Sequence, residues 1–151
     1  MQQSVPDMSD TSDLQAVAYV STATQLMGAS ELESLLIESR DFNLESGITG
    51  VLLYSDGVFM QYFEGTEAAV QAIYERVRGS RRHKGIVELL NERIARRSFP
   101  DWLMGFAQPT RSELLAMSTA RWRRMASEMQ DPSAASPGLI LLQSFWKDTR
   151  R

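Results

Sequence analysis

The feature that most constrains the fold of this 151-residue chain is a pair of apolar runs, residues 48–55 and 58–64, separated only by Asp56-Gly57. An Asp-Gly pair between two such runs is typical of a two-residue hairpin turn, because both positions can take the positive φ angles that the turn requires. We therefore predict an antiparallel β-hairpin near the middle of the chain, with the other segments packed against its faces.

Segments with strand-like and helix-like periodicity lie on both sides of the hairpin. Residues 14–21, 86–94 and 102–107 are short apolar runs that we assign to strands, and Tyr19 shares a face of the first with Gln15, Val17 and Ser21. A capping box at residues 30–33 opens one helix, and Thr66 can cap a second. The order βαββαββ predicts an α+β, ferredoxin-like mixed sheet with two helices on one face. The inward positions of the two helices are Leu32, Leu35, Leu36, Ser39 and Asn43, then Val70, Ile73, Tyr74 and Val77.

The remaining segments lie before and after this predicted sheet-and-helix domain. We predict a disordered lead-in at residues 1–13, one folded domain at 14–110 and a C-terminal helical extension at 111–151. Within the extension we expect helices at 112–129 and 139–147, joined by a linker at 131–138 that contains two prolines and a glycine. These helices could cover the second face of the sheet, contact another subunit or bind a partner helix.

Composition excludes several classes of site. The chain has no cysteine, so disulfides, thiolate catalysis, iron–sulfur clusters and Cys-ligated zinc are ruled out. His83 is the one histidine, and we expect no bound metal. Residues 1–110 carry 9 Lys and Arg against 15 Asp and Glu, which argues against a general nucleic-acid-binding protein. No secretory signal and no run of about 18 apolar residues is present, so we expect a cytoplasmic protein that does not enter the membrane.

Three polar side chains interrupt the apolar pattern. Tyr19 lies in the first strand, Asn43 near the end of the first helix, and Gln61 in the third strand. Each has a simple explanation as a core tyrosine, a helix C-cap or an amide paired with backbone. In a ferredoxin-like sheet, however, the first and third strands are adjacent, so the three could converge between the sheet and the helices. Such groups suit hydrogen bonding to a flat heterocycle, and a phenol can also donate an electron and a proton.

Two further patterns allow both a structural and a functional interpretation. The basic stretch from Arg76 to Lys84 suits a solvated helix end, and it equally suits a clamp for a phosphate. Trp102 and Met104 share one face of the predicted fifth strand, where core packing is the default. Neither a Rossmann glycine motif nor a P-loop is present in the sequence.

Four segments of this chain, in this order, resemble the BLUF family of flavin-dependent blue-light sensors. They are AYVS around Tyr19, FNLESGITGVLLYSDGVFMQYFEG at residues 42–65, RRH at 81–83 and FPDWLMGF at 99–106. Each segment is weak alone, but the four together are highly specific. The resemblance runs from about Leu14 to Gln108.

The resemblance implies that FAD, with FMN as the alternative, is held noncovalently with its ring between the two helices. Tyr19 matches the electron and proton donor of the family, and Gln61 matches the amide that rearranges its hydrogen bonds to flavin N5 and O4. Asn43 matches the amide at the N3 and O4 edge of the ring, while Trp102 and Met104 match the variable partners on the fifth strand. The other implied cofactor contacts are apolar stacking residues and cations near the ring carbonyl or ribityl phosphate: Leu35, Val77, Arg76, Arg82 and His83.

One position departs from the family pattern. Family members often have the motif D.RH, and Ser80 stands here where that motif has Asp. The departure affects the expected sugar and phosphate contacts and leaves Tyr19 and Gln61 untouched.

On this resemblance we expect a blue-light photoreceptor and not an enzyme. The 41 residues from 111 to 151 are too few for an effector domain, so we expect signalling through the fifth strand and the C-terminal helices to a separate effector protein. We also expect a homo-oligomer of at least two copies. Three alternatives remain: an RNA-recognition-like module without flavin, a small acyl-phosphate hydrolase of the same topology, and a flavin-binding scaffold without a light-dependent partner.

Overall fold

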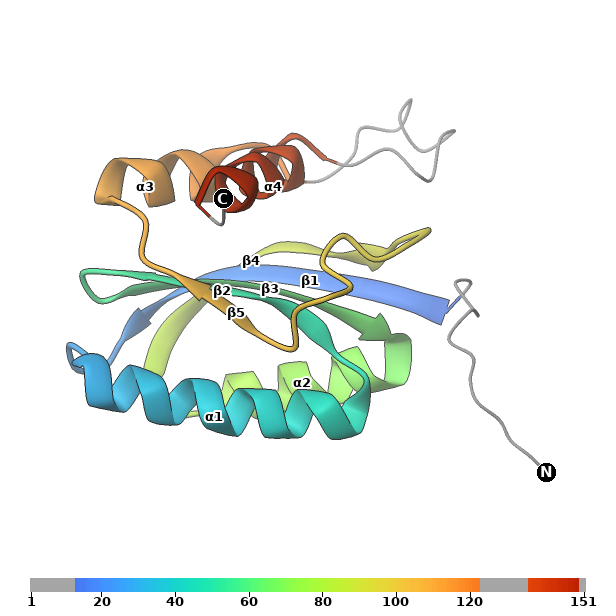
Figure 1. Ribbon diagram of the computed structural model, residues 1–151, viewed down its shortest axis with the longest axis horizontal. Helices are drawn as coiled ribbons and strands as arrows, with labels where there is room; N and C mark the ends of the chain where they lie inside the picture. Colours follow the sequence, from blue (N-terminus) through green and yellow to red (C-terminus); the bar gives the residue numbers. More distant parts are fainter. Residues whose placement is uncertain (1–12, 123–135, 150–151) are drawn as a thin grey trace.

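The computed structural model describes residues 13–122 and 136–149, which form a mixed sheet between two layers of helices (Figure 1). The five strands have the order β4-β1-β3-β2-β5, in which β5 runs parallel to β2 and the other neighbours are antiparallel. The predicted α+β, ferredoxin-like fold is confirmed. The elements are β1 Leu14–Ala23, α1 Ala29–Ser46, β2 Thr49–Ser55, β3 Val58–Thr66, α2 Glu67–Gly79, β4 His83–Arg93, β5 Gly105–Ala107, α3 Arg111–Thr119 and α4 Pro137–Thr149.

The predicted hairpin joins β2 and β3. Asp56 and Gly57 both have positive φ angles, 47° and 85°, and Ser55 pairs directly with Val58. On its other side β3 pairs with β1 in a register that sets Tyr19 opposite Gln61. The turn chemistry and the strand alternation therefore bring two of the three predicted polar residues side by side on the same face.

Helices cover both faces of the sheet. Figure 1 shows α1 and α2 beneath it and α3 and α4 above it. The upper core includes Tyr62 of β3, Met117 of α3, and Leu142 and Trp146 of α4. This arrangement confirms that the C-terminal helices cover the otherwise bare face, which was one of three expectations for them. It also disfavours the RNA-recognition alternative, because the face on which bases would stack is buried.

The lower face has a different organisation, since its apolar side chains form two separate clusters. Phe63 belongs to the cluster under α2, together with Val17 and Tyr19 of β1. Phe59 belongs to the cluster under α1, together with Leu36 and Met104. A domain core is usually one contiguous cluster. Gln61 lies between Phe59 and Phe63 along β3, at the boundary of the two clusters.

A buried carboxyl group fixes the segment that leads to β5. Glu64 is fully buried on the upper face, where it accepts hydrogen bonds from the backbone N–H groups of Ser98 and Phe99, at 2.9 and 2.6 Å, and from the Tyr62 hydroxyl at 2.9 Å. Burial raises the pKa of the Glu64 carboxyl, and these hydrogen bonds partly oppose the rise. The connection between β4 and β5 is thus held to β3 by hydrogen bonds to the Glu64 side chain and not by strand pairing.

The ends of the helices agree only partly with the sequence analysis. Thr66 caps α2 as predicted, accepting from the Ala69 N–H at 3.3 Å. The box predicted at residues 30–33 is wrong by two positions, because α1 begins after Gly28, whose N–H donates to the Glu31 carboxylate at 3.0 Å. The C-cap of α1 is Gly47, with a left-handed φ of 73°, and not Asn43.

Four other predicted boundaries are corrected. The fifth strand begins at Gly105 and not at residue 102, and α3 ends at Thr119, which leaves Trp122 outside the helix. The basic stretch divides between α2 and β4, which starts at His83. Pro137, assigned to the linker together with the following glycine, opens α4, since proline suits the first turn of a helix. The rest of the linker, the expected helix beyond residue 122 and the expected lead-in at residues 1–12 lie outside the described residues.

Helix α4 packs closely on the sheet through Trp146. Its ring meets the Trp102 ring at a centroid distance of 5.3 Å and the Phe99 ring at 6.4 Å, in both cases nearly perpendicular. A side chain on Gly105, at the start of β5, would collide with the same indole. The C-terminal helix is therefore in direct contact with the segment that precedes β5.

Two general properties of the described residues bear on function. Every helix in residues 13–122 and 136–149 is too short or too polar to cross a lipid bilayer. In the same ranges, no three His, Asp or Glu side chains gather as a metal site requires.

Candidate functional site

A cleft of about 270 Å³ opens between α1 and α2 on the lower face of the sheet, where the two lower clusters meet. Its floor is Tyr19 of β1 and Gln61 of β3, which are 4% and 8% exposed. The walls combine apolar side chains of the two helices with polar groups at either end. The lining residues are Tyr19, Leu35, Glu38, Ser39, Phe42, Asn43, Leu52, Phe59, Gln61, Ile73, Arg76, Val77, Ser80, Arg82 and His83.

A short chain of hydrogen bonds runs across the floor. The Tyr19 hydroxyl donates to Oε1 of Gln61 at 2.5 Å, and Nε2 of Gln61 donates to the Met104 sulfur at 3.5 Å. A thioether can accept a hydrogen bond but has no proton to donate. Met104 therefore favours the orientation in which the amide nitrogen of Gln61 faces it and the oxygen faces Tyr19.

The surroundings of Tyr19 keep its phenol neutral. The ring packs against both Phe63 and Tyr74, at centroid distances of 6.5 and 6.4 Å. Burial raises the pKa of the Tyr19 phenol well above its ordinary range, and the nearby Tyr74 adds to the rise. Tyr19 thus retains its proton, directed at Gln61, over the whole physiological pH range.

Helix α1 contacts the segment before β5 through two side chains. Asn43 donates through Nδ2 to the carbonyl of Leu103, and Arg40 donates through Nε to the carbonyl of Met104 at 3.0 Å. Asn43 is almost fully buried on the cleft wall, which is the inward position predicted for it. The amide has a second N–H and an oxygen, so it can also hydrogen-bond a molecule in the cleft.

The lining of the cleft also carries cations and His83. The imidazole Nε2 lies 2.8 Å from the Val77 carbonyl, so this nitrogen must be the donor, and Nδ1 lies 2.6 Å from the Ser21 hydroxyl. In the neutral ring Nδ1 therefore accepts from Ser21. Arg76 of α2 places its guanidinium 4.5 Å from the centre of the Phe42 ring on α1.

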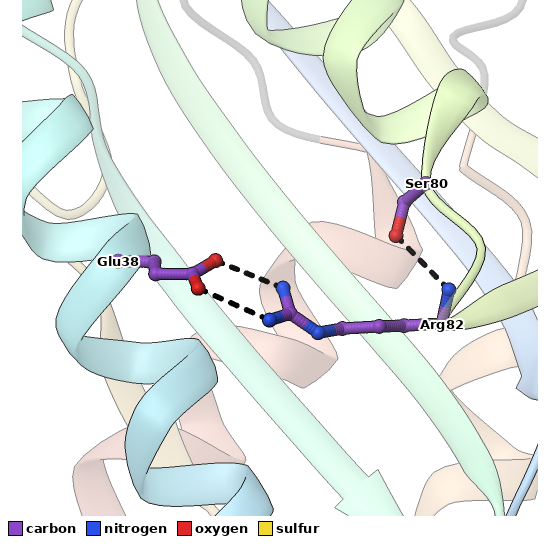
Figure 2. Close-up of polar contacts among 3 residues, drawn as sticks. All are labelled: Glu38, Ser80 and Arg82. Carbon is purple, nitrogen blue, oxygen red and sulfur yellow. Dashed lines mark hydrogen bonds and ion pairs between the residues drawn. The ribbon is translucent and has the colours of Figure 1, made fainter.

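Arg82 and Glu38 form an ion pair, as Figure 2 shows. Arg82 binds Glu38 of α1 in a bidentate manner, with Nη1–Oε1 and Nη2–Oε2 distances of 2.9 and 3.1 Å. The Arg82 backbone N–H donates to the Ser80 hydroxyl at 3.1 Å, at the position where the family motif has Asp. The hydrogen bond and charge of Arg82 hold the pKa of the Glu38 carboxyl below its ordinary value, so Glu38 is ionised at neutral pH.

The structure brings most of the residues singled out in the sequence around this one cleft. Eight of them line it: Tyr19, Leu35, Asn43, Gln61, Arg76, Val77, Arg82 and His83. Met104 contacts Gln61 beside the cleft.

Trp102 is the exception and requires a correction. The expectation that Trp102 and Met104 share a strand face is wrong, because Met104 packs with the α1 cluster whereas Trp102 packs on Trp146 in the upper core. Regular strand geometry begins only at Gly105. The alternation of side chains therefore does not apply to residues 102–104.

Four residues line the cleft although the sequence did not indicate them as site residues: Glu38, Phe42, Leu52 and Phe59. Glu38 and Phe42 follow Leu35 by three and seven positions, which places all three on one side of α1. This periodicity could have identified Phe42. The pairing of Glu38 with Arg82 spans 44 positions and leaves no local pattern.

Comparisons with known proteins agree with this geometry. The sequence model of the family described as "BLUF: Sensors of blue-light using FAD" matches residues 14–105. The beta subunit of the photoactivated adenylate cyclase of Euglena longa is 32% identical over 102 residues, which covers 66% of this chain and 12% of that protein. The blue light- and temperature-regulated antirepressor BluF of Escherichia coli is 35% identical over 69 residues, 46% of this chain and 17% of that protein. This chain thus spans only a small part of these relatives.

Solved structures show the same fold, in one case over nearly the full length of both chains. The dark-state structure of BlrB, a BLUF protein, has a TM-score of 0.66 and 29% identity, and the match covers 89% of this chain and 95% of that chain. The photo-activated state of BlsA has a TM-score of 0.62 and 31% identity over 69% of this chain and 78% of that chain. From the family model, these structures and a hydrogen-bonded Tyr–Gln pair on the floor of a cleft, we conclude that the chain belongs to the BLUF family of blue-light sensors.

Proposed function

We propose that this protein binds FAD noncovalently in the cleft between α1 and α2 and acts as a blue-light sensor without enzymatic activity of its own. The observation that carries the proposal is the hydrogen bond from Tyr19 to Gln61 at the cleft floor. FMN is the alternative cofactor, because it shares the ring and first phosphate, and one structural neighbour, BlrP1 of Klebsiella pneumoniae, was solved with FMN.

The residues of the cleft fit a flavin nucleotide in three respects. Leu35 and Val77 offer apolar surfaces from the two helices, as a flat ring requires. Amides at the floor and wall, Gln61 and Asn43, can meet the mixed donors and acceptors of the ring edge. Two arginines of the lining, Arg76 and Arg82, suit a phosphate. The volume, about 270 Å³, is close to the lower end of the range of about 300–1,000 Å³ for small-molecule sites.

The proposed photochemistry uses the chain's own hydrogen bonds. A bound flavin supplies a blue-absorbing group that is a strong oxidant when excited. With flavin bound, Tyr19 would give up an electron to the excited ring and its hydroxyl proton through Gln61, and it would recover both afterwards, so no net oxidation would occur. Gln61 ends rotated or tautomerised. A rotated amide would turn its oxygen toward the Met104 sulfur, which has no proton to donate, so the contact with Met104 is weakened.

The proposed output route starts at that contact. Met104 is followed by Gly105, which lies against the Trp146 ring of α4. A shift of Met104 would therefore be transmitted through the next residue, Gly105, to the packing of α4 on the sheet. Light would then change the relative populations of docked and displaced α4. In this account Met104 is the partner of Gln61, and Trp102 acts on the side of α4.

The proposal extends to the binding partners and the oligomeric state of the protein. The outer surfaces of α3 and α4 expose Leu115, Ile140 and Leu141, at 61%, 53% and 39%, and such side chains suit contact with a second copy or an effector protein. Two of the proteins that this chain resembles are described as a photoactivated and a light-regulated adenylate cyclase, which supports a role in controlling an effector. We propose a separate effector and a homo-oligomer of at least two copies. A cytoplasmic location stays a prediction from the sequence alone.

An absorption spectrum of the purified protein before and after blue light tests the proposal. We expect a yellow protein whose flavin bands move slightly to the red in light and return in the dark. The protein denatured after the measurement provides the control, since its released flavin can be identified as FAD or FMN by chromatography. A colourless protein, or a yellow one with no reversible shift, would contradict the proposed function.

A further inference from the structure

The ion pair between Arg82 and Glu38 joins the two walls of the cleft. Glu38 belongs to α1, whereas Arg82 lies in the short connection between α2 and β4. In Figure 2 the extended Arg82 side chain reaches from that connection to the Glu38 carboxylate on α1. Because both residues line the cleft, the pair bridges its walls directly.

The pair lies at the rim of the cleft and not at its floor. The side chains of Arg82 and Glu38 are 43% and 51% exposed, whereas Tyr19 and Gln61 are almost fully buried. A molecule that rests on the floor must therefore pass between the walls to leave. Arg76 over the Phe42 ring makes a second contact between α1 and α2 within the same cleft.

Local contacts fix the backbone from which the Arg82 side chain extends to Glu38. The Ser80 hydroxyl accepts the Arg82 backbone N–H, which fixes the turn from which the side chain extends. The fork geometry uses two of the five guanidinium N–H donors on the carboxylate. Bidentate Arg–carboxylate pairs have the defined geometry that a single-point contact of lysine lacks.

We propose that Glu38 and Arg82 form a clasp across the cleft rim that slows the release of bound flavin, an inference that rests on the proposed flavin site. The clasp sets the residence time of the cofactor and not its photochemistry. The rival role for Glu38 is competition with a ligand phosphate for the guanidinium. The two roles predict opposite signs when the Glu38 charge is removed, since loss of the clasp speeds release and loss of competition slows it.

The test measures flavin dissociation from the loaded protein by the recovery of flavin fluorescence after dilution into an excess of a flavin-scavenging protein. The variants are Glu38→Gln, Arg82→Gln and the charge-exchanged double variant Glu38→Arg/Arg82→Glu. Glu33→Gln is the matched control, because Glu33 is an exposed carboxylate of α1 that does not line the cleft. Each protein is loaded with FAD, FMN or riboflavin, and riboflavin isolates the clasp because it has no phosphate for Arg82 to bind.

We expect both single variants to release all three flavins roughly two to five times faster, in keeping with the modest strength of a half-exposed ion pair. The charge-exchanged variant should restore slow release of riboflavin, and the control should match the original protein. Added salt should speed the release of riboflavin from the original protein and have little effect on its release from Glu38→Gln.

Three outcomes would overturn the clasp. Unchanged release in both single variants shows that the pair does not retain the ligand. Slower release of FMN and FAD, but not riboflavin, from Glu38→Gln shows that Glu38 competes with the phosphate. A colourless original protein overturns the proposed function and the clasp with it, whereas a yellow, light-responsive protein with normal release in every variant overturns the clasp alone.

Discussion

Replacing Tyr19 by Phe should leave the protein yellow and abolish its light-induced red shift. The phenylalanine ring retains the packing on Phe63 and Tyr74, so the cleft keeps its shape. What is lost is the hydroxyl that donates to Gln61 at 2.5 Å, and with it the proposed source of the electron and proton. The measurement is the light-minus-dark absorption difference at equal flavin content, which should fall to the noise level.

Tyr74→Phe is the matched control for this variant. Tyr74 stacks on Tyr19 in the same cluster, but its hydroxyl donates to Glu88 at 3.0 Å and the residue does not line the cleft. The control should therefore keep the red shift. If Tyr19→Phe shifts and recovers like the original protein, Tyr19 is not the donor. If both variants lose the shift, the effect belongs to the aromatic cluster and not to the Tyr19 hydroxyl.

Replacing Trp146 by Ala should lower the free energy of unfolding more than any other substitution proposed for this protein. The indole is 6% exposed and fills the space over Gly105 while contacting Phe99 and Trp102. Truncating a buried aromatic side chain of this size costs about 3–5 kcal/mol. Chemical denaturation followed by circular dichroism should show that loss in the free energy of unfolding.

Ile140→Ala is the control on the same helix. Ile140 is 53% exposed, so its truncation should change the free energy of unfolding by less than about 0.5 kcal/mol. A loss below about 1 kcal/mol for Trp146→Ala would mean that α4 does not dock on the sheet in solution. A yellow Trp146→Ala protein that retains its red shift would place α4 after the photochemical step, as the proposed output route requires.

The parts of the fold that the sequence predicts well depend on local chemistry. The Asp56-Gly57 turn fixes the hairpin, and the two-residue period of β1 and β3 fixes the shared face of Tyr19 and Gln61. Hydrophobic periodicity likewise places Leu35 and Val77 on the inner sides of their helices. The turn and the alternation need no information from distant residues, which explains why they are predictable, and the pairing of β1 with β3 follows from the predicted ferredoxin-like order of the elements.

The parts that the sequence does not predict depend on contacts between distant residues. The path from residue 94 to β5 is set by Glu64, which accepts from Ser98 and Phe99, and by Arg40, which donates to the Met104 carbonyl. These contacts turn Met104 and Trp102 to opposite sides of the sheet. The BLUF resemblance identifies both residues, but strand periodicity assigns Trp102 to the wrong side.

The central claim is that Gln61 changes its hydrogen bonds when the flavin absorbs light. The most direct measurement is the light-minus-dark infrared difference spectrum of the flavin C4=O stretch, compared between the original protein and Gln61→Leu. We expect the original protein to show a downshift of that band, because a stronger hydrogen bond forms at O4, and we expect the leucine variant to bind flavin without the downshift. The same downshift in Gln61→Leu would contradict the account, since no amide would then be present to form the new bond.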